Sequence, residues 1–534
     1  MKRLLLPALL SLLATAGFAQ NVGTVSQNGT NNTGSTIQNG SSLTATVSQV
    51  GTVANTVSNT GITNQSGTGH TATVTQDGGS TFNRAYITQI GTSSGANSAT
   101  LSQNNGSGGN TARGGNPAIN TTANVANFSG IYQVGSSNVA SVNQDGTGTQ
   151  GNLGESIQKG TSNTATTTQS GGALNGVAQV FQGFEPGPAS TTVVGVDVAG
   201  NKASINQDAS LRNQATIRQF SDGNTATVEQ DGSSSAGNIA SVVQGDGVAL
   251  TLSGSNTATV EQSPNSLSNT AGITQLGYQN TAEVEQYSFS GMSSYNVASV
   301  TQTAGADRNL GKVYQGGLSE SDISSYNVGT ILQKGDDGAA YISQISNANY
   351  NNASIEQGVG SSFDKAGIYQ SASTSATASI TQNLTATGNG MPNLAEIDQT
   401  GSKNLATIAQ EGSANKAGIQ QIATGAGSNT ATVTQTGNYN MVGGPGTSNA
   451  DFTTGVTSFA TQNGAANSMV VTQMAATGTS AIHNTAMLSQ TGTGNILTVN
   501  QTISAGAMGG NTATVSQNGN GNVGSITQIN GMTP

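Results

Sequence analysis

The sequence predicts an all-β fold, a β-solenoid made of repeated strand, arc and strand. Three observations support this prediction: one short unit recurs along the chain, the unit alternates with a period of two, and large apolar side chains are scarce. Only 33% of the residues are hydrophobic and 4% aromatic, with no Trp and 74 Gly. Such a chain is either disordered or built of thin repetitive layers, and the regular period favours layers.

The charge and cysteine content exclude several functions. Charged residues make up 7% of the chain, and the formal net charge is -10. This balance argues against binding nucleic acid or an anionic membrane through a basic surface. The absence of Cys excludes disulfides, thiol catalysis and Cys-based metal sites.

Residues 1–19 have the pattern of a secretory signal peptide. Lys2 and Arg3 precede a short apolar stretch, and Gly17 and Ala19 are the small residues before an expected cleavage after Ala19. The alternative is a membrane anchor, but the apolar stretch is shorter than the roughly 20 residues that span a bilayer. No later segment is apolar enough to span either. We therefore expect a secreted, extracellular protein with a repeat region at 20–534.

The recurring unit reads Asn, any residue, Ala or Gly, any residue, Val or Ile, any residue, Gln. Clear copies begin at Asn201, Asn224 and Asn256. Alternation between named and variable positions indicates a β-strand. The variable face accepts residues as different as Thr and Lys, as a solvated surface would. The uniform Asn/Ala/Val/Gln face is therefore predicted to lie inside.

The inward positions supply the candidate functional residues of the chain. Buried Asn and Gln are costly unless every amide is paired, and a column of amides at one coil spacing can pair along the axis. The predicted inward amides are Asn213, Gln219, Asn224, Gln230, Gln275, Asn280, Gln286, Gln399, Asn404, Gln410, Gln490, Asn495, Gln501, Asn511, Gln517, Asn522 and Gln528. The predicted apolar core residues are Ala226, Val228, Ala406, Ile408, Ala513, Val515 and Ile526.

Links between units carry turn residues. Many run four residues from Gln to the next Asn and contain a Gly, which permits the positive φ of a tight reversal. Stacking each strand on its copy one coil later gives two parallel sheets that face each other across a thin Asn/Ala/Val/Gln core. Three stretches break the pattern, near 104–124, 183–200 and 437–455, and are expected to be irregular loops or joints; they could also be domain boundaries.

Both ends of the repeat region are expected to expose strand edges. A repeat from Asn21 to Gln27 follows the signal, and another from Asn522 to Gln528 lies close to Pro534. A finite solenoid needs capped ends, and uncapped ends present unpaired backbone groups. Another copy of the chain is the natural partner, so we expect stacking into cross-β-like fibres.

The spacing of these amides resembles the curlin repeat of curli, the bacterial amyloid fibres. The shared pattern is Gln, four residues, Asn, five residues, Gln. It begins here at Gln27, Gln133, Gln158, Gln219, Gln275, Gln399, Gln462, Gln490 and Gln517. The resemblance implies a structural subunit of a secreted amyloid-like fibre at the cell surface or in the biofilm matrix. It also implies a nucleator subunit and an outer-membrane export channel as partners. The chain departs from curlins in its larger number of repeats and in lacking a non-repeat export segment after the signal.

Motifs for chemistry are weak in this sequence. Gly91 to Gly95 matches Gly-x-Ser-x-Gly but lacks the strand-to-helix setting of a nucleophile elbow. His70 and His483 are expected at the surface, and the Asp-Gly pairs lack the ligand spacing of a calcium loop. We expect no enzyme activity, no cofactor and no metal.

Two other functions remain as alternatives. Thr430, Thr432 and Thr434 form an outward row like those on solenoids that bind ice. Glu, Lys, Arg and Tyr interrupt such rows elsewhere, which ranks this function lower. A monomeric surface adhesin would need caps or a separate binding domain.

Overall fold

The computed structural model describes residues 20–28, 31–50, 59–77, 83–91, 95–104, 111–112, 129–145, 151–183, 197–232, 236–245, 254–263, 266–287, 293–317, 322–383, 391–424, 427–444, 454, 456–476, 479 and 482–531. These residues form strands and no helix, so no described helix could cross a membrane. The chain divides into two compact units, residues 1–200 and 201–534. The predicted signal at 1–19 lies outside the described residues.

Unit 1 contains two parallel sheets. Sheet 1 is formed, in order, by β1 (Val22–Asn28), β3 (Thr44–Val50), β5 (Thr71–Asp77), β7 (Ser98–Asn104), β10 (Val139–Asp145) and β12 (Thr164–Ser170). Sheet 2 is formed by β2 (Thr33–Ser41), β4 (Thr60–Thr68), β6 (Arg84–Ile90), β8 (Thr111–Ala112) with β9 (Ser129–Ser136), β11 (Leu153–Thr161), and β13 (Val177–Gln182) with β14 (Val198–Ala199).

Unit 2 repeats this arrangement with more coils, where a coil is one strand from each sheet together with its links. Its sheet 1 contains β15 (Lys202–Asp208), β17 (Thr225–Asp231), β19 (Thr257–Gln262), β22 (Thr281–Tyr287), β25 (Leu310–Gly316), β27 (Ala339–Ile345), β29 (Lys365–Ser371), β31 (Leu394–Thr400), β33 (Lys416–Ala423), β35 (Met441–Gly443) with β36 (Ala460–Ala465), β38 (Asn484–Thr493) and β40 (Asn511–Asn518).

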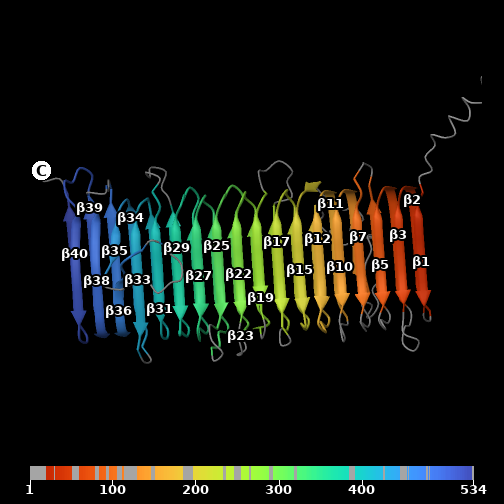
Figure 1. The fold of residues 1–534 in the computed structure, drawn as a ribbon. Helices are drawn as coiled ribbons and strands as arrows, with labels where there is room; N and C mark the ends of the chain where they lie inside the picture. Colours follow the sequence, from red (N-terminus) through yellow and green to blue (C-terminus); the bar gives the residue numbers. More distant parts are fainter. Residues whose placement is uncertain are drawn as a thin grey trace, which may run out of the picture. The chain divides into compact units, whose positions relative to one another are not determined.

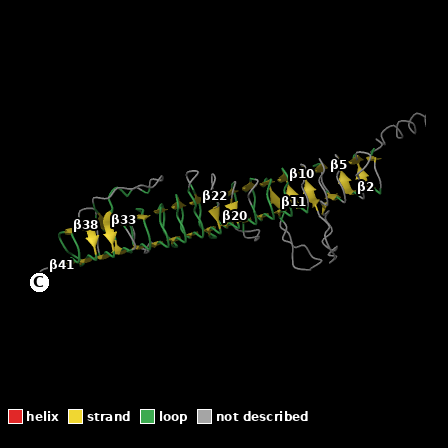
Figure 2. Ribbon diagram, turned by 90° about the horizontal axis from the view of Figure 1, so that it is seen from below, coloured by secondary structure: helices red, strands yellow, loops and turns green. Residues whose placement is uncertain are grey.

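Sheet 2 of unit 2 contains β16 (Gln214–Gln219), β18 (Ile239–Gln244), β21 (Thr270–Gln275), β24 (Val297–Gln302), β26 (Val328–Gln333), β28 (Asn352–Gln357), β30 (Thr377–Asn383), β32 (Leu405–Glu411), β34 (Thr430–Gly437), β37 (Ser468–Ala475), β39 (Ile496–Ile503) and β41 (Val523–Asn530). A short pair, β20 (Ser266–Leu267) and β23 (Ser293–Ser294), lies beside it. Within each unit the strands of sheet 1 run side by side (Figure 1), and the two sheets form two layers (Figure 2). The β-solenoid prediction is confirmed.

Like residues stack on like residues throughout the sheets. In the pair β17 and β19, Ala226 lies beside Ala258, Val228 beside Val260, and Gln230 beside Gln262. The strand burial pattern alternates accordingly, with Ala, Val or Ile and Gln buried and the residues between them partly exposed. Because the strands face a single thin core, a shift of one residue would turn every buried side chain outward.

Positive φ angles occur at the corners between strands. The prediction that link glycines supply them is confirmed for Gly223, Gly401, Gly492 and Gly519. It is wrong for Gly277, where Gln279 has a φ of 55° instead. Gly277 is required there for a different reason, because a Cβ would lie 2.0 Å from the carbonyl oxygen of Ala306 in the next coil.

The three irregular stretches interrupt strands and do not simply lengthen corners. β6 pairs first with β8 and then with β9, β11 pairs with β13 and then β14, and β33 pairs with β35 and then β36. The predicted loops were therefore wrong at 111–112, 198–199 and 441–443, which are strand segments that complete an in-register coil. Most other residues of these stretches lie outside the described ones.

Deleting one whole coil should leave the fold intact. Removal of residues 327–350 eliminates β26 and β27 and joins Tyr326 to Asn351. Tyr350 precedes Asn351 in the intact chain and has a φ of 56°, close to the 59° of Tyr326. We expect an unchanged far-UV circular dichroism spectrum per residue and a denaturation midpoint close to that of the intact chain, because each coil contacts only its neighbours.

A deletion shorter by one residue is the matched control. Removal of residues 329–351 joins Val328 to Asn352 and shifts the alternation. If Asn327 keeps its buried corner position, Ala353 and Ile355 turn outward. If Ala353 and Ile355 stay buried, Val328 must fill the buried corner position that the deleted Asn351 held. Both changes cost stability, so this variant should unfold at lower denaturant concentration. Equal midpoints for the two deletions would contradict the observed register.

Candidate functional site: the amide ladders

The inward Gln side chains form one ladder in each sheet of each unit. In every ladder the Nε2 of a Gln donates to the Oε1 of the Gln one coil later, at 2.7 Å both from Gln207 to Gln230 and from Gln230 to Gln262. Within the described residues, the sheet 1 ladder of unit 2 continues from Gln262 to Gln517 without a gap. The ladder in its sheet 2 runs in the same way from Gln219 to Gln528.

The same amides also join the two sheets. Gln230 of sheet 1 donates to the backbone oxygen of Gln214 in sheet 2 at 3.1 Å, and Gln219 of sheet 2 donates to that of Lys202 in sheet 1 at 2.9 Å. An amide nitrogen carries two hydrogens, so each Gln can serve both the ladder and the opposite sheet. The sequence predicted the ladder but not this bond across the core.

The inward Asn side chains bond mainly to backbone. The Oδ1 of Asn224 accepts the backbone N–H of Asn256 at 3.0 Å, and the Oδ1 of Asn256 accepts that of Asn280 at 2.9 Å. The Nδ2 of Asn280 donates to the carbonyl oxygen of Ala306 at 2.7 Å. Asn therefore fixes the corner of the next coil, whereas Gln fixes the strand.

In unit 2, the structure places the sequence-predicted residues on the inward faces of the two sheets. Most are buried: Asn213, Gln219, Asn224, Gln230, Gln275, Asn280, Gln286, Gln399, Asn404, Gln410, Gln490, Asn495, Gln501, Asn511, Gln517, Ala226, Val228, Ala406, Ile408 and Ala513. Four are partly exposed because they lie on the last described strands, β40 and β41, or directly before β41: Val515, Asn522, Ile526 and Gln528.

His70 was predicted at the surface, and this prediction is wrong. It is fully buried at a corner position that Asn occupies in other coils. Its Nδ1 accepts the backbone N–H of Asn97 at 3.1 Å, as an Asn oxygen would. Burial lowers the pKa of His70 and so favours the neutral ring that can accept this bond. His483 is half-buried.

Asp364 occupies an Asn position in unit 2. Its Oδ1 accepts the backbone N–H of Asn393 at 2.7 Å, but its Oδ2 has no hydrogen-bond partner among the described residues. An ionised carboxylate cannot donate as the Nδ2 of Asn does. Burial raises the pKa of Asp364 to about 6, although the bond from Asn393 acts in the opposite direction. Asp364 is thus a titratable break in the Asn column.

Charges on the outer face gather on sheet 1 of unit 2. In-register pairing places Glu229, Glu261 and Glu285 in consecutive strands. Burial, together with the neighbouring Glu283 and Glu261, raises the pKa of Glu285 to about 8. The ammonium group of Lys312 lies 2.5 Å from a carboxylate oxygen of Glu283. These residues face solvent and do not take part in the inward ladders.

The other candidate motifs gain no support. The residues between Gly91 and Gly95 lie outside the described part of the chain. Asp337 forms an ion pair with Arg308 at 2.7 Å, and Asp336 accepts the backbone N–H of Asp307, so both serve the turn. Among the described residues, no group of three or more His, Asp or Glu side chains is arranged to hold a metal ion.

The fold and the ladders define a class of protein, a parallel β-solenoid whose coils are joined by stacked amides. Residues 390–422 match the family model of the curlin associated repeat. This segment includes Gln399, Asn404 and Gln410, so the resemblance to the curlin repeat is confirmed there and the chain carries a curlin repeat. No curated protein matches the sequence.

Removing one rung of a ladder should destabilise the fold. In Gln230→Ala, Gln207 loses its acceptor and Gln262 its donor, and each unpaired buried group costs about 1 to 3 kcal/mol. Thr227→Ala, on the outward side of the same strand, is the control and should cost well under 1 kcal/mol. Denaturant unfolding of the soluble chain measures both, and equal losses would contradict the assignment of inside and outside.

Replacing Asp364 by Asn should remove a pH dependence. A carboxyl group with a raised native pKa destabilises the fold once it ionises, so stability should rise as the pH falls from above 6 to about 4. Above pH 6, Asp364→Asn should stabilise this region by on the order of 2 kcal/mol. Hydrogen exchange of the amides around 364 measures the effect. Glu411→Gln, at an exposed site, is the control. If the Asp364→Asn variant keeps the wild-type pH dependence, Asp364 is not the group that causes it.

Proposed function

We propose that the protein is a structural subunit of a secreted amyloid-like fibre of the curli type, which grows by end-to-end stacking of solenoid coils. The observation that carries this proposal is that the strands at each end of the described repeats have one unpaired edge, where the Gln ladder also stops. β41 pairs with β39 and β1 pairs with β3, and in the described chain neither has a strand on its other edge. Unpaired parallel edges are templates for another chain.

The direction of the ladders makes the two ends complementary. At the last strands, Gln517 and Gln528 accept from the preceding coil and donate across the core to Ile496 and Thr512, with no further Gln beyond them in the described chain. At the first strand, Gln27 donates to Gln49 at 2.6 Å, so its own Oε1 faces away from the stack. A donor end can therefore meet an acceptor end of another copy, which gives head-to-tail growth.

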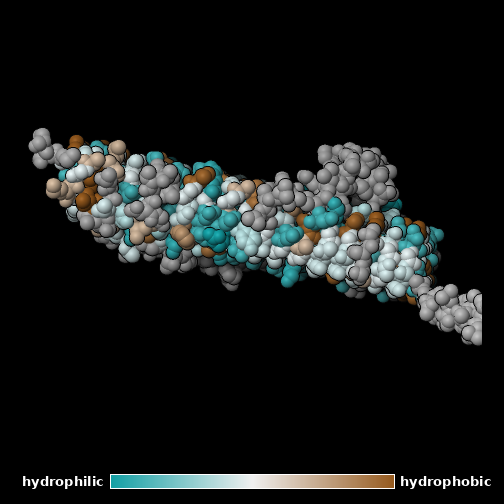
Figure 3. Space-filling model, turned by 90° about the horizontal axis from the view of Figure 1, so that it is seen from above, coloured by the Kyte–Doolittle hydropathy of each residue, from teal (hydrophilic) through white to brown (hydrophobic). Residues whose placement is uncertain are grey.

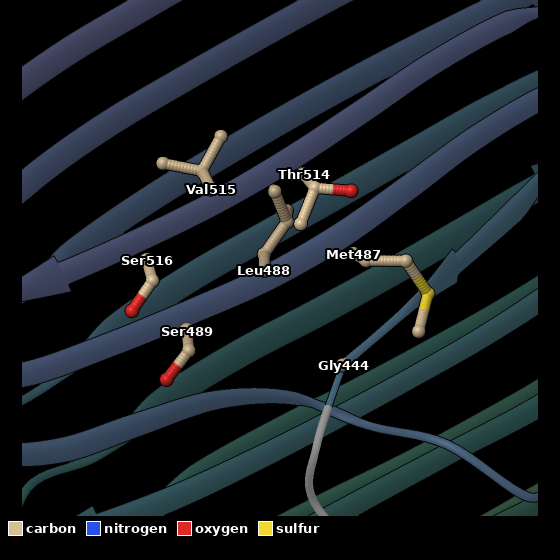
Figure 4. Close-up of a pocket in the computed structure, with 7 residues that line it drawn as sticks. All are labelled: Gly444, Met487, Leu488, Ser489, Thr514, Val515 and Ser516. Atoms are coloured by element: carbon tan, nitrogen blue, oxygen red, sulfur yellow. The ribbon is translucent and has the colours of Figure 1, made fainter.

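The last strand also exposes apolar side chains that an added coil would partly cover. Val523 and Ile529 of β41 are 75% and 73% exposed. A separate open cavity of about 400 Å3 lies on the outer face of β38 and β40, away from the free edge. It is lined by Leu488 and Val515 together with Gly444, Met487, Ser489, Thr514 and Ser516 (Figure 4). By contrast, hydrophobic residues form only small separate patches on the face that Figure 3 shows.

The remaining parts of the proposal rest on the family match and on the sequence. A curlin repeat supports an extracellular place in a fibre at the cell surface or in the biofilm matrix. We include a cleaved signal at 1–19, a nucleator subunit and an outer-membrane export channel in the proposal by the same resemblance. We assign the chain no catalytic activity.

Capping one end should stop growth there. Outward residues donate their backbone N–H to the next coil, as Ile496 does to the carbonyl oxygen of Asn522. Thr514→Pro together with Thr527→Pro therefore removes donors from the free edges of β40 and β41, and Pro is not tolerated inside a paired strand. Added to wild-type seeds, this variant should attach through its intact first coil and then block the next copy, so elongation should fall at substoichiometric amounts. Thioflavin fluorescence and electron microscopy follow elongation.

The control variant carries Thr514→Val and Thr527→Val, which keep the backbone N–H groups and should permit elongation. If the proline variant supports normal growth, end-to-end stacking is wrong even if fibres form. If the wild-type chain stays monomeric at high concentration and does not extend seeds, the fibre function itself is wrong and a monomeric adhesin is favoured.

A further inference from the structure

The outer face of sheet 1 in unit 1 is an ordered array of hydroxyl groups. In-register pairing aligns its outward residues in three ranks. The first rank is Val22, Thr44, Thr71, Ser98, Val139 and Thr164; the second is Thr24, Thr46, Thr73, Thr100, Ser141 and Thr166; the third is Ser26, Ser48, Thr75, Ser102, Asn143 and Thr168. We call these eighteen positions the hydroxyl face.

The hydroxyl face has no charged and no aromatic residue at these positions. The interruptions that the sequence suggested lie elsewhere. Sheet 1 of unit 2 carries Glu229, Glu285 and Lys312 at equivalent positions, and sheet 2 of unit 1 carries Arg84 and Tyr86. The fold thus gathers Thr and Ser into three neighbouring ranks, which a reading of the linear sequence missed; charged residues of the same sheet, Asp77 and Asp145, lie at the next outward position of β5 and β10.

The array is regular and stiff. Parallel strands place successive ranked residues about 4.8 Å apart along the axis and about 6.7 Å apart along each strand. Thr is restricted at χ1 because it is β-branched, so each Thr of the face presents a hydroxyl and a methyl group with little freedom. Beneath it, the ladders through Gln49, Gln76 and Gln103 fix the strand positions.

We propose that the hydroxyl face binds ice. The spacing along the axis is close to a repeat distance between water oxygens in hexagonal ice, so the hydroxyl groups can order water at a similar interval in that direction. Water held by several fixed polar groups costs little further ordering, and the methyl groups, together with Val22 and Val139, separate the hydroxyls.

The composition of the face favours ice over other occupants. A crystalline polysaccharide would be expected to engage aromatic rings, and these eighteen positions contain none. A protein partner would be expected to use large apolar or charged side chains at the centre of the contact, and the face offers only Thr, Ser, one Asn and two Val residues. A rigid lattice of water oxygens fits repeated small hydroxyl groups.

Two lysines at the centre of the face should abolish ice binding. Lys312 holds the same rank in β25 of unit 2, so the solenoid accepts Lys at this position. The test variant carries Thr73→Lys and Thr100→Lys, and the control carries Thr330→Lys and Thr432→Lys, at the same rank on sheet 2 of unit 2. Single ice crystals are grown in solutions of the purified chain, and their facets and growth rate are recorded.

We expect the wild-type chain and the control to facet ice and slow its growth, and the test variant to need at least a tenfold higher concentration. Circular dichroism and seeded elongation should be the same for all three, which separates this proposal from fibre assembly. Ice growth unaffected by the wild-type chain, or equally affected by the test variant, would overturn the proposal. Binding to insoluble cellulose or chitin that only the test variant loses, without any effect of the wild-type chain on ice, would assign the face to a polysaccharide and also overturn it.

Discussion

The hydrogen bond between Gln side chains of successive coils is the interaction on which the rest of the structure depends. A thin core of Ala, Val and Ile supplies modest hydrophobic stabilisation, and many registers could bury it. The amides are more demanding, because each must find both a donor and an acceptor at one coil spacing. Only the in-register arrangement, with Gln230 between Gln207 and Gln262, achieves this for every coil. Burial favours a compact chain, and the amides select one register.

This division of roles leaves the outer faces free to vary. A substitution at an outward position touches no ladder, so the chain can carry Glu285 and Lys312 in one region and mostly Thr and Ser in another without altering the coil. Burial, Glu283 and Glu261 together raise the pKa of Glu285, and Glu261 is its in-register neighbour, so repeated stacking can place like charges side by side. Different surface chemistry can therefore be placed on a common interior.

The sequence was sufficient to predict the fold and the inward face, because the period of two and the uniform amides can be recognised in the linear sequence. It was not sufficient for bonds that depend on the opposite sheet. The bond from Gln219 to the carbonyl of Lys202 joins residues of two strands whose alignment is known only in the folded chain. His70 was misplaced for a related reason: its ring nitrogen replaces an Asn oxygen, and composition alone suggested a surface residue. The alignment of Thr and Ser in neighbouring ranks of one sheet also required knowledge of which strands share that sheet.

The interrupted strands indicate where such a chain can accept insertions. β35 and β36 together occupy one place in sheet 1 of unit 2, although a long segment separates them. The position of the second piece is set by β33 beneath it and not by the length of chain that connects it to the first. A solenoid of this kind can therefore accept foreign sequence in the middle of a strand while the coils on both sides keep their alignment. Such sites offer places to display a peptide or a small domain at a defined height along the stack.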